Sequence, residues 1–105
     1  MQHAQIRDLV RAHSYRVRSH CVQHMVEEGF DENQMLEALN GKLPVVEEYP
    51  DENRLLLLGY FHFSPTSRCA LHIVCDVSRA DHVDLVTAYI PSKPWWTSPT
   101  QRGQL

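Results

Sequence analysis

The chain lacks any apolar segment long enough to cross a membrane. None of its hydrophobic runs approaches the roughly 18 residues that a membrane-spanning helix requires. Its N-terminal stretch, MQHAQIRDLVRAHSYRVR, is polar and lacks the apolar centre that marks a signal peptide. We therefore expect a cytoplasmic protein that makes no contact with a membrane.

Cysteine is scarce, and its pattern is not that of a disulfide-stabilised protein. The three cysteines, Cys21, Cys69 and Cys75, are an odd number, so a disulfide framework would leave one thiol unpaired. Cys69, His72 and Cys75 have the spacing of a metal clip, but along a strand His72 points to the face opposite both cysteines. We predict that Cys69 and Cys75 pack as small apolar residues and that the protein holds no metal ion.

Motifs for nucleotide binding and for familiar catalytic centres are also missing. The sequence has no Gly-rich phosphate loop, no nucleophile elbow and no paired-carboxylate site, and we expect no cofactor. The net charge is −3, whereas nucleic-acid-binding proteins usually carry a basic surface. The charge is uneven, because residues 1–24 hold four arginines against one acid and residues 25–53 hold nine acids against one lysine. A negative total therefore does not exclude a positive face.

The composition and the N-terminal pattern predict one domain that begins with helices. Of the 105 residues, 43% are hydrophobic and 22% are charged, which is ordinary for a globular domain covering 1–105. From about residue 4 to 28, apolar residues recur at helical spacing, with a division expected near Ser14–Tyr15. Gly29 is placed to end this helix. Asp31, with Gln34 three residues later, is placed to begin a second helix that stops at Asn40–Gly41.

The pattern then changes to strands joined by short turns. Pro44 assigns the first strand to an edge of the sheet, and the continuous hydrophobicity of the second predicts a central strand covered on both faces. Turns of about four residues favour an antiparallel meander. We predict an α+β fold in which N-terminal helices pack on one face of a four-stranded, mainly antiparallel sheet, with the other face partly open to a ligand. The expected strands cover residues 42–49, 54–63, 68–77 and 82–90.

Polar residues with catalytic chemistry occur on one helix face and inside the strands. Arg16, His20 and His24 are spaced four residues apart, so a helix would place them on one face. His72 interrupts an apolar strand, either as a hydrogen-bonded core histidine or as an imidazole with a pKa tuned for acid–base work. Near the end of the last strand, Thr87 and Tyr89 share one face.

The remaining candidates are two arginines and two tryptophans. Arg54 and Arg68 are expected at opposite ends of a hairpin. Trp95 and Trp96 follow the last strand, where they either fold back over the sheet or present a contact for a partner. A set of His, Arg, Tyr and Thr side chains suits metal-free cleavage of RNA, in which one group takes the proton of the 2′-OH and another protonates the leaving oxygen.

Several blocks of the sequence resemble a widespread family of small bacterial proteins of unknown function. The blocks are SHCVQHMVEEGF, EALNGKLPVVEEYPDENRLLLLGYF, ALHIVCDV and VDLVTAYIP with a following tryptophan, and they cover about residues 19–96. The family is similar in layout to RelE-like ribonuclease toxins of the barnase/EndoU/colicin type. Its members often look like partners of MqsA-type zinc-finger antitoxins. Residues 97–105 lie beyond the family-like core and are expected to form a flexible tail.

The resemblance implies a RelE-like, toxin-like endoribonuclease that cleaves RNA without a metal and has a zinc-finger antitoxin as its partner. It implies catalytic roles for His20, His72 and Tyr89. His24 stands where the family usually has arginine, which weakens a phosphate-clamp role at that position. The alternative is a non-catalytic module that binds a partner protein or forms a homodimer. The expected substrate-binding residues are Arg16, His24, Arg54, Arg68 and Thr87.

Overall fold

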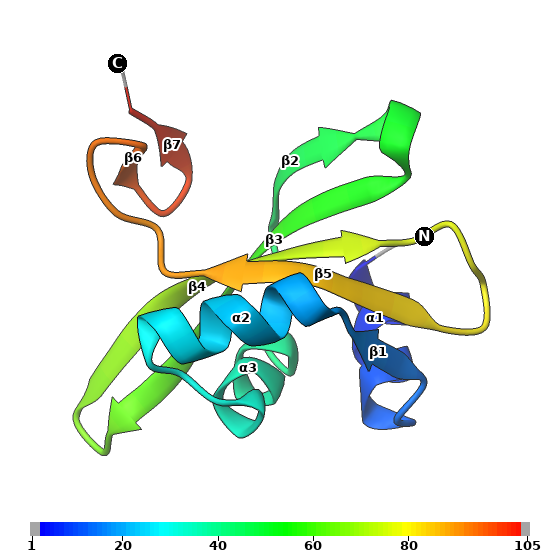
Figure 1. Ribbon diagram of the computed structural model, residues 1–105, viewed down its shortest axis with the longest axis horizontal. Helices are drawn as coiled ribbons and strands as arrows, with labels where there is room; N and C mark the ends of the chain where they lie inside the picture. Colours follow the sequence, from blue (N-terminus) through cyan, green and yellow to red (C-terminus); the bar gives the residue numbers. More distant parts are fainter. Residues whose placement is uncertain (1–2, 104–105) are drawn as a thin grey trace.

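The chain folds into three helices, a five-stranded sheet and a small C-terminal hairpin (Figure 1). The structure is a computed structural model that describes residues 3–103. Among these residues, no helix is both long and apolar enough to span a bilayer. The helices are α1 (His3–Arg11), α2 (Ser19–Glu28) and α3 (Glu32–Leu39), with a 3-10 turn at Pro50–Glu52. The strands are β1 (Tyr15–Val17), β2 (Val45–Tyr49), β3 (Arg54–Ser64), β4 (Ser67–Asp76), β5 (Val83–Tyr89), β6 (Trp96–Ser98) and β7 (Gln101–Arg102).

The main sheet is mixed, whereas the sequence predicted four mainly antiparallel strands. Its order is β1-β5-β4-β3-β2, and β1 runs parallel to β5 while the other neighbours are antiparallel. The α+β class is confirmed, but the strand count was wrong because β1 has only three residues. His13, with φ of 60°, ends the first helical segment, and Tyr15 then pairs with Val83. Three residues are too few to reveal a period-two pattern beside long helical stripes.

The ends of α2 and α3 follow the local sequence signals. Gly29 adopts φ of 80° and its N–H donates to the Met25 carbonyl, as a left-handed helix end requires. The Asp31 carboxylate accepts from the Gln34 N–H at 2.8 Å, and the Gln34 side chain accepts from the Asp31 N–H at 2.9 Å. Both helix ends are therefore confirmed, and together they fix the turn that places α3 beside α2.

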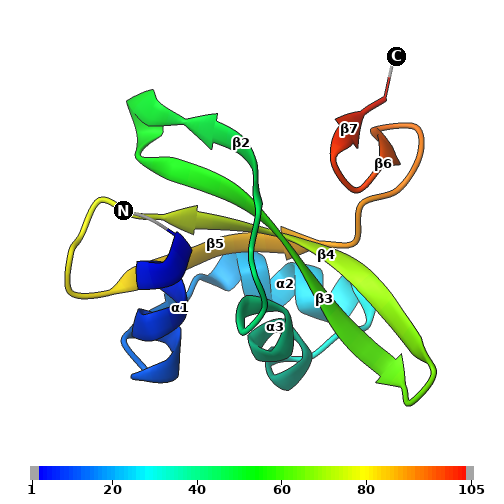
Figure 2. The same ribbon diagram turned by 180° about the vertical axis from the view of Figure 1, so that it is seen from behind.

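The helices cover one face of the sheet and bury its apolar side chains (Figures 1 and 2). Cys21 and Cys75 are fully buried in this core, and burial raises the pKa of the Cys75 thiol to about 12. β3 is a central strand whose Leu56 and Leu57 are both buried on opposite faces, as predicted. The largest fully buried core side chains on the helix side include Ile6, Met35, Leu39, Leu57, Leu71, Ile73 and Leu85.

The middle of the other face is covered by the C-terminal hairpin of β6 and β7. In both ribbon views this hairpin lies on the side of the sheet opposite the helices. Residues 97–102, expected to belong to a flexible tail, form most of this hairpin, and 104–105 lie outside the described part. Trp96 is 4% exposed and its ring meets the His72 ring, so the hairpin adds a second, smaller core on this face. Local composition could not predict this packing, because it depends on a histidine in a distant strand.

Candidate functional site

A cleft of about 370 Å³ opens where β5 ends, between α2 and the C-terminal hairpin. It is the place where predicted site residues from the helix and from the last strand meet. Trp95 at its rim is 59% exposed, in contrast to the buried Trp96 next to it. The cleft is lined by His24, Glu28, Tyr89, Ile90, Ser92, Trp95, Trp96 and Arg102.

Two histidines on α2 form one side of the site. His20 and His24 lie one helical turn apart, and their ring centroids are 4.6 Å apart in an edge-on arrangement. The Nδ1 of His24 lies 3.4 Å from a carboxylate oxygen of Glu28, which orients the ring. The other oxygen of Glu28 accepts from the Ile90 N–H at 2.9 Å, so the same carboxylate ties α2 to the end of β5. His20 is exposed beside the cleft rather than in its lining.

Tyr89 and His72 form the floor of the site. Tyr89 lines the cleft, and its hydroxyl lies 3.2 Å from Nδ1 of His72 on the neighbouring strand. Nε2 of His72 lies 2.6 Å from the Pro99 carbonyl, which only accepts, so Nε2 carries the proton and Nδ1 accepts from Tyr89. Burial raises the pKa of Tyr89 and lowers the pKa of His72. The imidazole is therefore neutral near pH 7 and holds the Tyr89 hydroxyl in place.

His72 is closed off from any ligand. Its side chain is fully buried below the Trp96 ring, with centroids 4.4 Å apart, and below Pro99. Both ring nitrogens have partners, so this is a hydrogen-bonded core histidine, one of the two interpretations that its sequence left open. The structure does bring His72 and Tyr89 together, but of the two only Tyr89 lines the cleft. Direct contact between His72 and a substrate is therefore not available in this arrangement.

Arg102 fastens the hairpin over this floor and was missed by the sequence analysis. Its guanidinium donates two hydrogen bonds of 2.8 Å to the Glu47 carboxylate on β2. This pair lowers the pKa of Glu47 to about 2, and Tyr49 also donates to the same carboxylate. The guanidinium lies 4.6 Å from the centroid of the Trp96 ring. Arg102 thus joins the cleft, the hairpin and β2.

Thr87 lies close to the site but does not line the cleft. It pairs with Val74 across β4 and β5, two residues before Tyr89 on the same face. Its Oγ1 is buried and has no hydrogen-bond partner among the residues that the structure describes. Substrate contact at Thr87, which we expected from the final-strand pattern, has no support from its position.

Arg16 and Arg54 lie at the opposite end of the sheet. Arg16 is on β1, not on a helix with His20 as predicted, and its Nε lies 3.2 Å from the Asp84 carboxylate. The register places Arg16, Asp84, Asp76 and Arg54 in one row across four strands. Tyr89 lies five residue steps along β5 from Asp84, which is about 17 Å. Neither arginine can therefore contact a phosphate held at Tyr89.

Arg68 also lies away from the cleft, near the tip of the β3–β4 hairpin. It faces His62 across the two strands, at the far end from Arg54, so the opposite placement of the two arginines is confirmed. Its guanidinium lies 4.3 Å from the centroid of the Tyr60 ring. Arg68 lines a second cleft of about 740 Å³, which shares no lining residue with the cleft at Tyr89.

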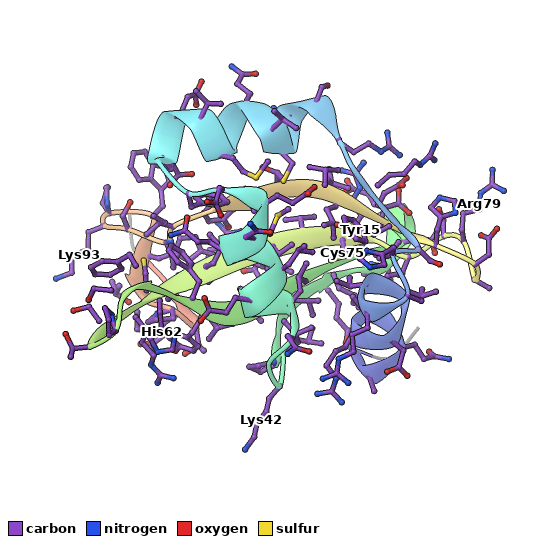
Figure 3. The ribbon with its side chains drawn as sticks, turned by 90° about the horizontal axis from the view of Figure 1, so that it is seen from below. Tyr15, Lys42, His62, Cys75, Arg79 and Lys93 are labelled. Atoms are coloured by element: carbon purple, nitrogen blue, oxygen red, sulfur yellow. The ribbon has the colours of Figure 1, made fainter. Side chains whose placement is uncertain are left out.

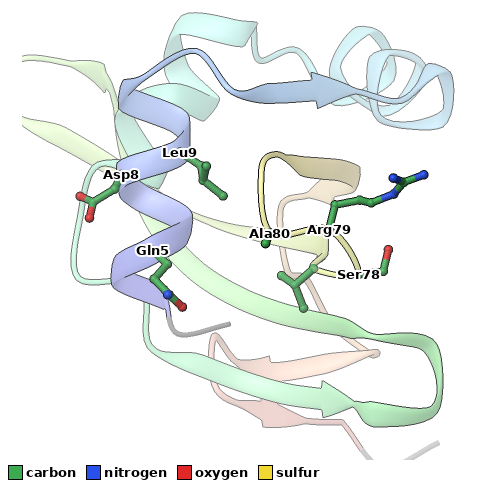
Figure 4. Close-up of a pocket in the computed structure, with 7 residues that line it drawn as sticks. Gln5, Asp8, Leu9, Ser78, Arg79 and Ala80 are labelled. Carbon is green, nitrogen blue, oxygen red and sulfur yellow. The ribbon is translucent and has the colours of Figure 1, made fainter.

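A third cleft, of about 540 Å³, lies between α1 and the loop that joins β4 to β5 (Figure 4). None of the predicted site residues lines it. Asp8 and Arg79 point in opposite directions there, so its charged groups do not converge on one position. Within residues 3–103, no cluster of three or more His, Cys, Asp or Glu side chains is arranged to hold a metal ion.

The sequence signal for the missed residues was weak but present. In the segment WTSPTQR, Ser-Pro-Thr stands between Trp-Thr and Gln-Arg. Ser-Pro favours a turn, and a turn at this place is compatible with a hairpin. It predicts a turn but not the sheet face on which the hairpin lies.

A comparison of the chain with protein-family models, with curated proteins and with solved structures finds no match in any of the three.

Proposed function

We propose that the chain is a toxin-like endoribonuclease that cleaves RNA without a metal at the cleft between α2, the end of β5 and the C-terminal hairpin. One observation carries the proposal: His24, Tyr89 and the exposed Trp95 line the same cleft. Imidazoles supply acid–base catalysis near neutral pH, and an exposed indole is a stacking surface for an unpaired base. If these three side chains lay in separate places on the surface, they would not support a reaction.

In this proposal His24 and His20 move the protons. Glu28 holds Nδ1 of His24, which leaves Nε2 to take the proton from the ribose 2′-OH. The 2′-oxygen attacks the phosphorus, and the bond from phosphorus to the 5′-oxygen breaks. His20, in its protonated form, gives a proton to that 5′-oxygen. The products are a 2′,3′-cyclic phosphate and a free 5′-hydroxyl.

Tyr89 contacts the phosphate in this reaction. In the free protein its hydroxyl donates a hydrogen bond to Nδ1 of His72. Rotation about the phenol C–O bond turns the same hydroxyl proton toward a phosphate oxygen. His72 acts through Tyr89 and is a positioning residue. Arg102 lines the cleft, but the carboxylate of Glu47 offsets most of its charge, so it holds the hairpin rather than clamping the phosphate.

The test is cleavage of a single-stranded RNA by the purified chain in the presence of EDTA. We expect His24→Ala to lower the rate by about a hundredfold or more, the usual contribution of a general base or acid. Tyr89→Phe is expected to lower it by about tenfold, the loss of one hydrogen bond to a charged group. Gln23→Ala, on the solvent side of the same helix, is the matched control and keeps the wild-type rate. Cleavage that needs a metal, or that survives both site changes, refutes the proposal.

A RelE-like affiliation of the fold and a zinc-finger antitoxin as partner form part of the same proposal. They are supported by helices on one face of the antiparallel run from β2 to β5 and by the sequence blocks given above. Co-expression with such an antitoxin should restore growth to cells in which the chain alone is toxic. Toxicity that persists in the His24→Ala variant would separate the toxic effect from RNA cleavage.

A second candidate function, a self-associating module, is favoured by the exposure of Trp95. An indole that is 59% exposed beside a buried one is a typical anchor of an interface. Analytical ultracentrifugation of wild type and Trp95→Ala distinguishes the candidates. A wild-type dimer that dissociates on this change supports the self-associating module. A monomer in both cases excludes that module and assigns the exposed Trp95 to the cleft.

A further inference from the structure

The outer edge of β3 is open over half of its length. β2 pairs with β3 only between Arg54 and Leu57, whereas β4 accompanies β3 as far as Ser64. Figure 2 shows β2 leaving β3 near its middle, so the rest of the β3–β4 hairpin extends without a strand on the other side. On this side the backbone of residues 58–62 therefore has no strand beside it.

Pro44 ends the pairing between β2 and β3 for a chemical reason. The Leu58 N–H donates to the Pro44 carbonyl at 3.0 Å, but proline has no N–H to return to the Leu58 carbonyl. Backbone groups alternate in direction along a strand, so Tyr60 and His62 present their N–H groups to the same side as Leu58. The His62 N–H confirms this direction, because it meets the Glu37 carboxylate at 3.1 and 3.2 Å.

Tyr60 is left between these two positions with its N–H and carbonyl pointing outward. No strand among residues 3–103 faces it on this side. In an antiparallel sheet, a residue in this position exchanges both hydrogen bonds with one residue of the neighbouring strand. The edge at Tyr60 is thus prepared for one more strand.

Two cationic side chains line the groove beside this edge. It has a volume of about 740 Å³, and Lys42 and Arg68 contribute to its lining. Neither cation has a carboxylate partner within residues 3–103, and Arg68 instead lies over the Tyr60 ring. In Figure 3, Lys42 extends from the loop after α3 into solvent, on the same side of the molecule as His62. The full lining is Gly41, Lys42, Leu43, Pro44, Leu58, Gly59, Tyr60, His62 and Arg68.

We propose that this edge binds an extended acidic segment of a partner protein, which adds to β3 as an antiparallel strand. The backbone of the segment pairs with Tyr60, and its carboxylates face Lys42 and Arg68. A second copy of this chain fits poorly, because a symmetric contact would bring the same two cations against each other. Glu37 occupies the His62 N–H in the free protein and shields the edge until the segment arrives.

The test uses two acetylated and amidated peptides on the full, isotopically labelled chain. One alternates valine with glutamate, and the other alternates valine with lysine. We expect the glutamate peptide to shift the Tyr60 amide signal in NMR spectra and to slow its hydrogen exchange. The lysine peptide should bind at least about tenfold more weakly, since two attractive charge contacts become repulsive. The double change Lys42→Glu with Arg68→Glu alters two exposed side chains and should invert this preference.

Several results would overturn the proposal. Unchanged hydrogen exchange at Tyr60 with the glutamate peptide at millimolar concentration would show that no strand is added. Equal binding of both peptides would remove the role of the cations. Protection of Tyr60 by an oligoribonucleotide and not by the glutamate peptide would assign the groove to RNA. Protection that grows with protein concentration alone would assign the edge to a second copy.

Discussion

Replacing Glu47 by glutamine tests whether the C-terminal hairpin is held to the sheet by its ion pair with Arg102. The change keeps the shape of the side chain and removes its charge. Glutamine retains one oxygen that can accept from the guanidinium, so two 2.8 Å bonds between opposite charges become one bond from the charged guanidinium to a neutral amide oxygen. The hairpin covers the floor of the cleft, so its attachment affects both stability and the shape of the site.

The size of the effect follows from the pKa of Glu47. The Arg102 guanidinium lowers this pKa from its ordinary value of 4.5 to about 2. The difference between the two values corresponds to about 3 kcal/mol of stabilisation at neutral pH. The Glu47 side chain is 25% exposed and that of Arg102 is 55% exposed, so solvent screening reduces the expected loss to about 1–2 kcal/mol.

The direction of the pH dependence is fixed by the lowered pKa. The carboxylate contributes its full stabilisation above the ordinary pKa of 4.5 and loses it as the pH falls through the folded-state pKa of about 2. Wild type should therefore lose about 1–2 kcal/mol more than Glu47→Gln across this window. The two proteins should differ most near pH 7 and converge at the acid end.

Urea denaturation at several pH values measures this directly. Glu48→Gln is the matched control, because Glu48 is the next residue on β2 and is exposed. We expect Glu48→Gln to change the unfolding free energy by less than about 0.5 kcal/mol at every pH. A Glu47→Gln variant as stable as wild type near pH 7, or a deficit that persists unchanged at the acid end, would refute the reasoning.

Three further changes probe the core and the helix caps. A methyl group added at Gly59 would lie 2.5 Å from the Ala38 carbonyl oxygen, so Gly59→Ala should lower the unfolding free energy by about 1–3 kcal/mol. Gly41→Ala is the control and should be tolerated, because the nearest atom to its added methyl group is 3.5 Å away. His72→Leu leaves two partly buried polar partners, the Tyr89 hydroxyl and the Pro99 carbonyl, without this hydrogen-bond partner and should cost about 1–3 kcal/mol. Because burial lowers the pKa of His72, wild type should also lose stability as the pH falls below the ordinary value of 6.5, and this component should vanish in the leucine variant. Asp31→Ala removes the capping box of α3 and should cost about 1 kcal/mol, measured by the same denaturation experiment.

The elements that sequence reasoning predicted depend on neighbours along the chain. The helix ends at Gly29 and Asp31 follow from contacts within a few residues, and so does the edge position of Pro44. The shared face of His72, Thr87 and Tyr89 follows from the two-residue period of strands once β4 and β5 pair. These features needed no knowledge of how distant parts of the chain meet.

The rest depended on long-range pairing that no local pattern specifies. Helical spacing suggested a common face for Arg16 and His20, but β1 carries Arg16 away to Asp84 across the sheet. Arg102 entered the site because a terminal hairpin folds back onto β2, 55 residues away in sequence. The same fold buried His72, so a residue that we expected to touch substrate instead holds the hydroxyl of Tyr89, which lines the cleft.

A single atomic change in the substrate tests the central claim most directly. The purified chain is given an RNA oligonucleotide in EDTA, and then the same oligonucleotide with 2′-deoxyribose at each cleaved position. The proposed chemistry at His24 requires the 2′-hydroxyl as nucleophile, so the RNA should yield 2′,3′-cyclic phosphate ends and the substituted oligonucleotide should remain intact at those positions. Cleavage of both oligonucleotides at equal rates, or of neither, would contradict the assignment of this cleft as a ribonuclease site.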